Sequence, residues 1–119
     1  PPGVYHYHPF HHRLERLLGN DGVVLLKELP NYPFAKDAPL MLFISGLFER
    51  SMRKYRERGY RFVLLEAGAL LQNVYLVSSA LDLPVCAIGM DTDREVEKIL
   101  DLDESVENIV GQIVIGKRK

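Results

Sequence analysis

Two adjacent titratable side chains, Lys54 and Tyr55, are the first candidates for chemistry. A lysine with a lowered pKa, or a tyrosine, can act as a general acid or base if it is partly buried. The segment around them also fits a solvated helix face, because six basic residues crowd together there: Arg50, Arg53, Lys54, Arg56, Arg58 and Arg61. The residues alone therefore leave two interpretations open, a proton-transfer pair and a basic surface.

A second candidate is the turn at Gly89, which ends a short apolar run from Val85 to Ile88. A turn between a strand and a helix presents backbone N–H groups, and these can bind an electron-rich atom of a cofactor. Glycine there can equally serve only to permit a tight turn. Both interpretations stay open at this position.

The four histidines lie close together near the N-terminus, at positions 6, 8, 11 and 12. His6 and His8 share one face of a predicted strand, a spacing that can bind a metal ion. No Asp, Glu or Cys accompanies them, so we predict no metal site.

Other polar and reactive side chains have ordinary structural interpretations. Cys86 lies within an apolar strand, where a small buried side chain is expected. Glu66, Gln72 and Asn73 could line a pocket, or could be satisfied by the backbone or a neighbouring subunit. The tail Lys117–Lys119 could meet a phosphate, or be a frayed charged end.

The elements that must position these residues interleave strands and helices, which predicts an α+β or α/β fold. A strand is expected at Val4–His8 and a turn at Gly19–Gly22. Arg13–Leu18 could be a return strand or a short helix, and we favour the strand that closes a hairpin. Buried strands are expected at Leu40–Ser45, Val85–Ile88 and Val106–Ile115, helices at Val23–Leu29, Leu47–Arg58 and Asp93–Leu100, and a loop at Pro30–Pro39. Asp91 or Thr92 could cap the last helix.

The segment Arg61–Leu83 is the longest stretch without proline and is apolar on nearly every side. That pattern predicts a buried helix, in which the small Gly68 and Ala69 admit a close neighbour. The polar residues Glu66, Gln72 and Asn73 argue against a membrane span.

Composition narrows the functional classes. The chain has 119 residues, 47% hydrophobic and 26% charged, with a net charge of −1 and one cysteine. This balance does not favour broad nucleic-acid binding, and a single cysteine fits a reducing, cytoplasmic setting. The predicted elements leave one face of the hairpin uncovered, and the first residues are Pro-Pro-Gly without Met. We therefore expect one domain over residues 1–119 that is part of a longer domain or of an intertwined dimer.

Several linked motifs occur in a familiar order: GVYHYHPFHHRLERL, KYRERGYRFVLLEAGALLQNVYL, LDLPVCAIGMDTD and IVIG. Together they resemble the C-terminal half of the nitroreductase superfamily, and within it the SagB-type dehydrogenases, flavin enzymes that oxidise azolines to azoles in ribosomal peptides. The resemblance implies an α+β fold with a mostly antiparallel central sheet, FMN as cofactor, and a dimer with flavin sites at its interface.

The resemblance also assigns residues. A Lys-Tyr pair carries proton chemistry in that branch, and here the pair would be Lys54 and Tyr55. The turn beside the flavin would be Ala87, Ile88, Gly89 and Met90. This sequence departs from the family in lacking its Arg-rich phosphate segment and in having Ala69 where many members have His.

Three functions follow as hypotheses. The first is an FMN-dependent oxidoreductase, or part of one, that transfers hydride between flavin and a small-molecule or peptide substrate, including azoline rings. The second is a flavin-free nitroreductase-like module that acts as a dimerisation or peptide-binding scaffold. The third is a general nitro or quinone reductase that uses NAD(P)H. The expected partner is a second copy or a complementary N-terminal half.

Overall fold

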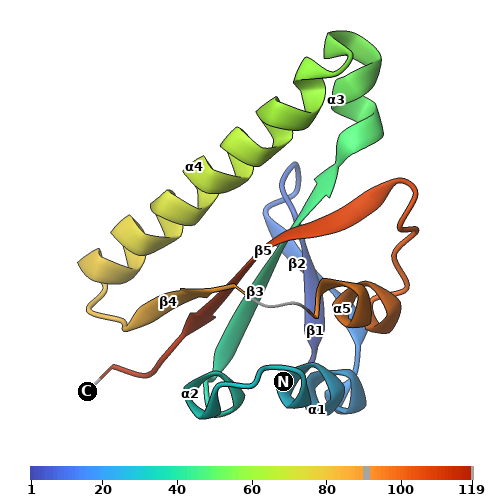
Figure 1. Ribbon diagram of the computed structural model, residues 1–119. Coiled ribbons are helices and arrows are strands. Elements are labelled where there is room, and N and C mark those ends of the chain that lie inside the picture. The colour runs from blue at the N-terminus through green and yellow to red at the C-terminus, as the bar shows by residue number, and fades with distance from the viewer. Residues whose placement is uncertain (90–91, 119) are drawn as a thin grey trace.

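A computed structural model describes residues 1–89 and 92–118 and contains the predicted mixture of helices and antiparallel strands (Figure 1). The strands are β1 (Val4–His8), β2 (Arg13–Leu18), β3 (Leu40–Leu47), β4 (Val85–Ile88) and β5 (Glu107–Ile115). The helices are α1 (Asn20–Glu28), α2 (Pro33–Lys36), α3 (Phe48–Tyr55), α4 (Arg58–Ala80) and α5 (Asp93–Ile99).

The strands form two antiparallel sheets. β1 pairs with β2 in a hairpin, and the other three strands are ordered β3-β5-β4. β5 is the central strand, and Gln112, Ile113, Val114 and Ile115 on it are all buried. Because β3 and β4 both run antiparallel to β5, their carboxyl ends point the same way. β4 ends opposite Gln112, whereas β3 continues to the residue opposite Glu107, so the segment after β3 begins five residues farther along β5.

Helices cover both faces of the three-stranded sheet. α4 crosses one face, and α1, α2 and α5 lie on the other (Figure 1). On the second face Leu26, Val96 and Ile109 form one buried cluster. A smaller cluster joins the α2 region to Ile88 and Val114.

Several predicted boundaries were wrong. Gly19–Gly22 is not a turn, because α1 begins at Asn20. Gly22 is buried in this helix, and a Cβ there would lie 2.7 Å from Leu18 Cβ, so the glycine permits close packing. The predicted loop at Pro30–Pro39 contains α2, which Pro33 begins. Gly59 does not end the charged helix: α3 ends at Tyr55, and Gly59 lies within α4.

The prediction that the long helix is buried was also wrong for this chain. In α4 only Gly59, Val63 and Ser78 are buried. A Cβ on Gly68 would meet nothing within 4 Å, so no close neighbour lies there. The apolar pattern was read correctly, but the chain supplies a packing partner for only one side of the helix.

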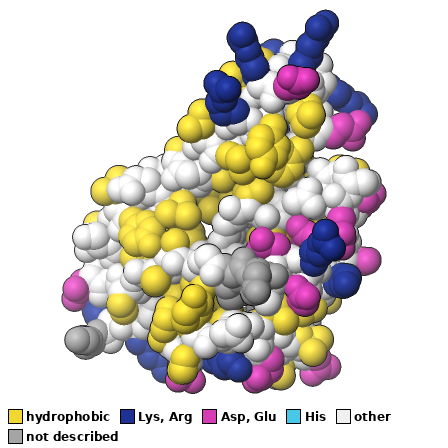
Figure 2. Space-filling model, viewed as in Figure 1, with side chains coloured by type: hydrophobic (Ala, Val, Ile, Leu, Met, Phe, Trp, Pro, Cys, Tyr) yellow, Lys and Arg dark blue, Asp and Glu magenta, His cyan; other side chains and the backbone are white. Residues whose placement is uncertain are grey.

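The outer side of α4 is an apolar stripe of exposed side chains that includes Phe62, Leu65 and Leu76. Figure 2 shows hydrophobic side chains gathered along this helix, with basic side chains at the α3–α4 end. By length and composition alone, α4 could cross a membrane. The same helix packs against the sheet through its inner side, and it carries exposed Glu66, Gln72 and Asn73.

Candidate active site

A cleft of about 600 Å³ lies where β3 ends and α3 and α4 meet. Gly46 lets the helix approach the strand, since a Cβ there would be 2.7 Å from Val63 Cγ1. The lining comes from β1, β3, α3, α4 and β5, and its polar members are His6, Ser45, Arg50, Ser51, Lys54, Tyr55, Glu66 and Glu107. Ligand sites commonly have volumes in this range.

The structure brings Lys54 and Tyr55 together in this cleft. The Lys54 Nζ lies 5.1 Å from the centre of the Tyr55 ring. The Tyr55 ring packs edge-on against Phe62, with ring centres 5.1 Å apart. Both side chains are exposed, so they stand in an open cleft and not in the partly buried setting that the chemistry requires.

The two interpretations of the basic segment apply to different residues. Arg50 lines the cleft beside Lys54. Arg53 instead pairs with Glu49 on the same helix, with Nη2 2.6 Å from Oε1, and its side chain is 77% exposed. The segment therefore contributes cations both to the cleft and to solvent.

Two carboxylates face the same cleft. Glu66 lines it, which agrees with the pocket interpretation of this residue, whereas Gln72 and Asn73 are exposed and outside its lining. Glu107, at the start of β5, accepts a hydrogen bond from the Ser45 hydroxyl near the end of β3. The sequence analysis missed Ser45 and Glu107, because no local pattern connects residues so far apart in the chain.

The predicted cofactor turn is located apart from this lining. The Ala87 N–H donates to the Tyr75 hydroxyl at 2.7 Å, so this amide is already engaged. Ile88 is 8% exposed and packs in the core with Val114. Gly89 is exposed, and a Cβ there would meet nothing within 4 Å. Met90 lies outside the described residues.

Strand direction and register separate the Gly89 turn from the cleft. The turn follows β4 and the Lys54 region follows β3, and the two strands point the same way. Ile88 at the end of β4 lies opposite Gln112, whereas Leu47 at the end of β3 lies opposite Glu107. The two strand ends are therefore about 19 Å apart, because they differ by two strand spacings across the sheet and by five residues along β5.

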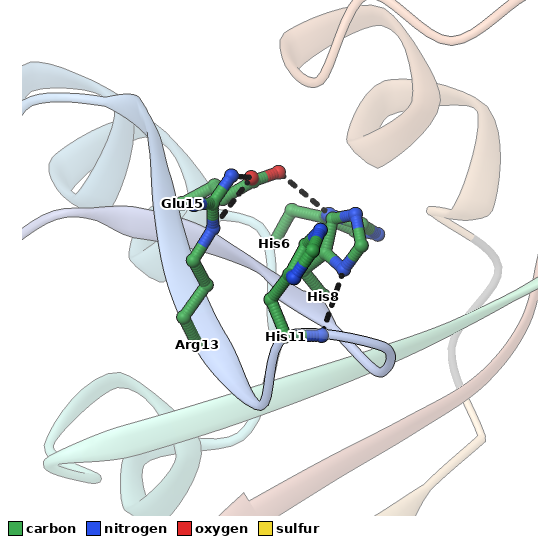
Figure 3. Close-up of polar contacts among 5 residues, drawn as sticks. All are labelled: His6, His8, His11, Arg13 and Glu15. Carbon is green, nitrogen blue, oxygen red and sulfur yellow. Dashed lines mark hydrogen bonds and ion pairs between the residues drawn. The ribbon is translucent and has the colours of Figure 1, made fainter.

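The histidine-rich hairpin is shown in Figure 3. The expectation that no acidic residue accompanies the histidines was wrong. Glu15 on β2 is the cross-strand partner of His6, and the His6 Nδ1 lies 3.6 Å from the Glu15 carboxylate. Arg13 donates to the same carboxylate from Nη2 at 2.6 Å. That hydrogen bond holds the pKa of Glu15 below its ordinary value.

His8 and His11 lie against each other at the hairpin tip, with ring centres 4.6 Å apart. Within residues 1–89 and 92–118, no group of three or more His, Cys, Asp or Glu side chains is arranged to hold a metal ion.

The remaining candidates lie outside the cleft. Cys86 is exposed, contrary to the prediction, because β4 is an edge strand; its Sγ donates to the Ala87 carbonyl at 3.3 Å. Arg118 Nε lies 3.6 Å from Asp82, beyond the C-terminal end of α4, whereas the cleft adjoins the N-terminal half of that helix. Arg118 is therefore not placed to bind a phosphate in this cleft, and Lys119 lies outside the described residues.

Comparison with protein families decides the classification, because the model of the nitroreductase family matches residues 5–117. This chain belongs to the nitroreductase family. Protein MJ1384 of Methanocaldococcus jannaschii is 36% identical over 107 residues, which are 86% of this chain and 52% of that protein. The microcin B17-processing protein McbC of Escherichia coli is 32% identical over 103 residues, 85% of this chain and 38% of McbC.

A trifolitoxin-processing protein, TfxB of Rhizobium leguminosarum bv. trifolii, is 31% identical and matches 98% of this nitroreductase-family chain and 33% of its own length. Among solved structures, the E. coli microcin synthetase McbBCD complex with truncated pro-MccB17 bound has a TM-score of 0.85 at 26% identity, covering 97% of this chain and 44% of that one. A nitroreductase-like structure from Anabaena variabilis also has a TM-score of 0.85, at 26% identity, over 96% of this chain and 24% of its own.

These likenesses confirm the nitroreductase-like α+β fold, and the two processing proteins support the SagB-type branch. The chain spans about half the length of MJ1384, and less of the other two curated relatives.

Proposed function

We propose that this chain is the C-terminal part of an FMN-dependent oxidoreductase of the SagB type. The observation that carries the proposal is the meeting of Lys54 and Tyr55 in one cleft with Glu66, Glu107 and Arg50. The family match supports oxidoreductase chemistry. The domain is completed by polypeptide outside Pro1–Lys119 or by a second copy in a dimer.

The proposed roles follow from the chemistry of azoline oxidation, in which a ring loses one C–H hydrogen as a proton and another as a hydride. FMN, when bound, supplies the acceptor for the hydride. Lys54 and Tyr55 take the proton, one as base and the other as hydrogen-bonding partner, because both can reach the same space in the cleft. Closure of the open cleft by further polypeptide would give the pair the partial burial that this role needs.

The residues of the Gly89 turn fit a cofactor only in part. Gly89 is the favoured contact, since its exposed backbone has open space around it. The Ala87 amide is engaged by Tyr75, and the Ile88 side chain is in the core, so these residues would support the turn rather than donate to flavin.

The substrate class is a peptide that carries azoline rings. Two relatives are named as processing proteins for peptide products, and one similar structure is a complex that holds a truncated pro-peptide. We propose that this protein likewise works with other subunits on a peptide, in the cytoplasm.

One observation favours the second candidate, a flavin-free scaffold: the predicted cofactor turn and the Lys54–Tyr55 pair do not line one cavity within the described part of the chain. A scaffold would bind a partner or peptide without a redox cofactor.

An absorption titration separates the two candidates. Purified protein, as the cell makes it, is titrated with FMN while the flavin bands near their visible maximum are followed. Saturable binding with a shifted spectrum supports the oxidoreductase, whereas a spectrum equal to the sum of protein and free FMN at every ratio contradicts it. Titration with riboflavin is the matched control, because it lacks the phosphate.

A further inference from the structure

The hydroxyl of Tyr75 connects the long helix α4 to the strand that leads to the Gly89 turn. Tyr75 is half-buried on α4, on the same side of the helix as half-buried Leu71 and buried Ser78. Its oxygen accepts the Ala87 N–H at 2.7 Å. β4 is an edge strand beside β5, so an Ala87 N–H that reaches α4 points away from β5. The contact therefore lies on the open edge of the sheet, just before the turn.

The Tyr75 hydroxyl can make one more hydrogen bond. A phenol oxygen accepts and also carries a hydrogen of its own, and here the accepting role is taken by Ala87. No acceptor for that hydrogen lies among residues 1–89 and 92–118. A hydroxyl that accepts an N–H becomes a stronger donor, because linked hydrogen bonds polarise one another. Tyr75 therefore presents a strengthened donor beside β4.

The neighbouring backbone explains why a side chain is needed in this role. Both polar groups of Ala87 are engaged, since its N–H donates to Tyr75 and its carbonyl accepts from Cys86 Sγ at 3.3 Å. The N–H groups of alternate residues in a strand point to the same side, and Gly89 is next in that row after Ala87. Gly89 is exposed, with open space where a side chain would be. The edge thus offers two donors in sequence, the Tyr75 O–H and the Gly89 N–H.

We infer that the Tyr75 hydroxyl is a second hydrogen-bond donor to the flavin ring, beside the donor that Gly89 supplies. The inference rests on the proposed function, in which the Gly89 turn adjoins FMN. A flavin ring has nitrogen and carbonyl-oxygen acceptors close together along one edge, so neighbouring donors suit it. A fixed donor stabilises the electron-rich reduced ring more than the oxidised ring. Tyr75 therefore favours reduction of the flavin as well as its binding.

A matched pair of substitutions on one helix tests the inference. Tyr75→Phe removes the hydroxyl and keeps the ring. Tyr60→Phe is the control, because Tyr60 is 54% exposed and stacks on Phe48 near the opposite end of α4. Both variants are made in the polypeptide as the cell makes it. We expect Tyr75→Phe to weaken FMN binding about three- to tenfold and to make the reduction midpoint of the bound flavin more negative, whereas Tyr60→Phe changes neither.

The two measurements together separate a contact with flavin from a structural role. Weaker binding with an unchanged midpoint potential would mean that Tyr75 only supports β4, and this result would overturn the inference. Unchanged binding and potential would overturn it as well. Tighter binding by Tyr75→Phe would show that Tyr75 competes with flavin for the Ala87 N–H, which also contradicts the assigned role.

Nuclear magnetic resonance of the unsubstituted protein gives a second readout, should Tyr75→Phe fail to fold. The tyrosine ring carbon that bears the hydroxyl is labelled with carbon-13, and its signal reports on the hydrogen bond that the hydroxyl donates. The Tyr75 signal should move as FMN saturates the protein, and a fixed signal with flavin bound would overturn the inference alone. If the unsubstituted protein binds no FMN, the proposed function is overturned, and the inference with it.

Discussion

Ser45, near the end of β3, donates its hydroxyl hydrogen to the carboxylate of Glu107 at the start of β5, 62 residues later in the chain. The contact spans the last three residue pairs of the β3–β5 ladder, just beyond the register shift between Ile44 and Ser45. It also fixes a carboxylate in the wall of the cleft that contains Lys54.

Ser45→Ala should lower the free energy of unfolding by about 1 kcal/mol, because it removes a hydrogen bond to a charged group at an exposed site. Chemical denaturation measures the change. Ser79→Ala, on the exposed side of α4, is the control and should change stability by less than about 0.5 kcal/mol. Equal effects of the two substitutions would mean that the Ser45–Glu107 contact contributes nothing.

Gly59 and Gly68 lie in the same helix and should respond oppositely to alanine. A Cβ on Gly59 would lie 2.7 Å from the Met52 backbone nitrogen, so Gly59→Ala must push α3 away and should cost about 1–3 kcal/mol. Gly68 has open space around it, so Gly68→Ala should stabilise Pro1–Lys119 by about 0.5–1 kcal/mol through helix propensity. Unfolding curves of the two variants decide the matter, and a stabilising Gly59→Ala would refute the close packing of α3 on α4.

The double substitution Lys54→Ala with Tyr55→Phe should abolish turnover of the flavin-loaded protein while FMN remains bound. The reason is that the proposed roles of these side chains are in proton transfer and not in cofactor retention. Turnover and flavin absorbance are measured on one preparation. Arg53→Ala, which removes a neighbouring cation paired with Glu49 outside the cleft, should leave both unchanged. Full activity in the double variant would show the catalytic assignment to be wrong.

Glu15 should titrate below the ordinary range for glutamate, since the Arg13 guanidinium stabilises its charged form. A carboxyl whose pKa is lowered on folding adds stability above its unfolded pKa, and that contribution is lost as the pH falls through its folded pKa. Carboxyl-carbon NMR gives the titration directly. Arg13→Ala should raise the pKa of Glu15, and an unchanged titration in that variant would contradict the assigned cause.

Local patterns predicted the parts of the fold that depend on local interactions. The strand Val4–His8 was predicted with the observed bounds, because its residues alternate beside a turn. Of the two interpretations of Arg13–Leu18, the strand was correct. The cores of the three sheet strands were found as apolar runs. The turn at Gly19–Gly22 was mistaken, since glycine that permits close packing and glycine that permits a turn look alike in sequence.

The site was predictable only where neighbours in sequence are neighbours in space. Lys54 and Tyr55 are adjacent, and both line the cleft. Glu107 could not be found, because its place beside Ser45 depends on the pairing of β3 with β5. Apolar periodicity in α4 revealed a surface that needs covering, but periodicity carries no information about which polypeptide covers it.

The exposed apolar side of α4 can make the folding equilibrium of this chain depend on the protein concentration. When folded chains can bury Phe62, Leu65 and Leu76 against one another, association draws the equilibrium toward the folded state, and the apparent melting temperature rises with the amount of protein. A stability measured for Pro1–Lys119 therefore refers to one protein concentration, and its variants are compared at that concentration.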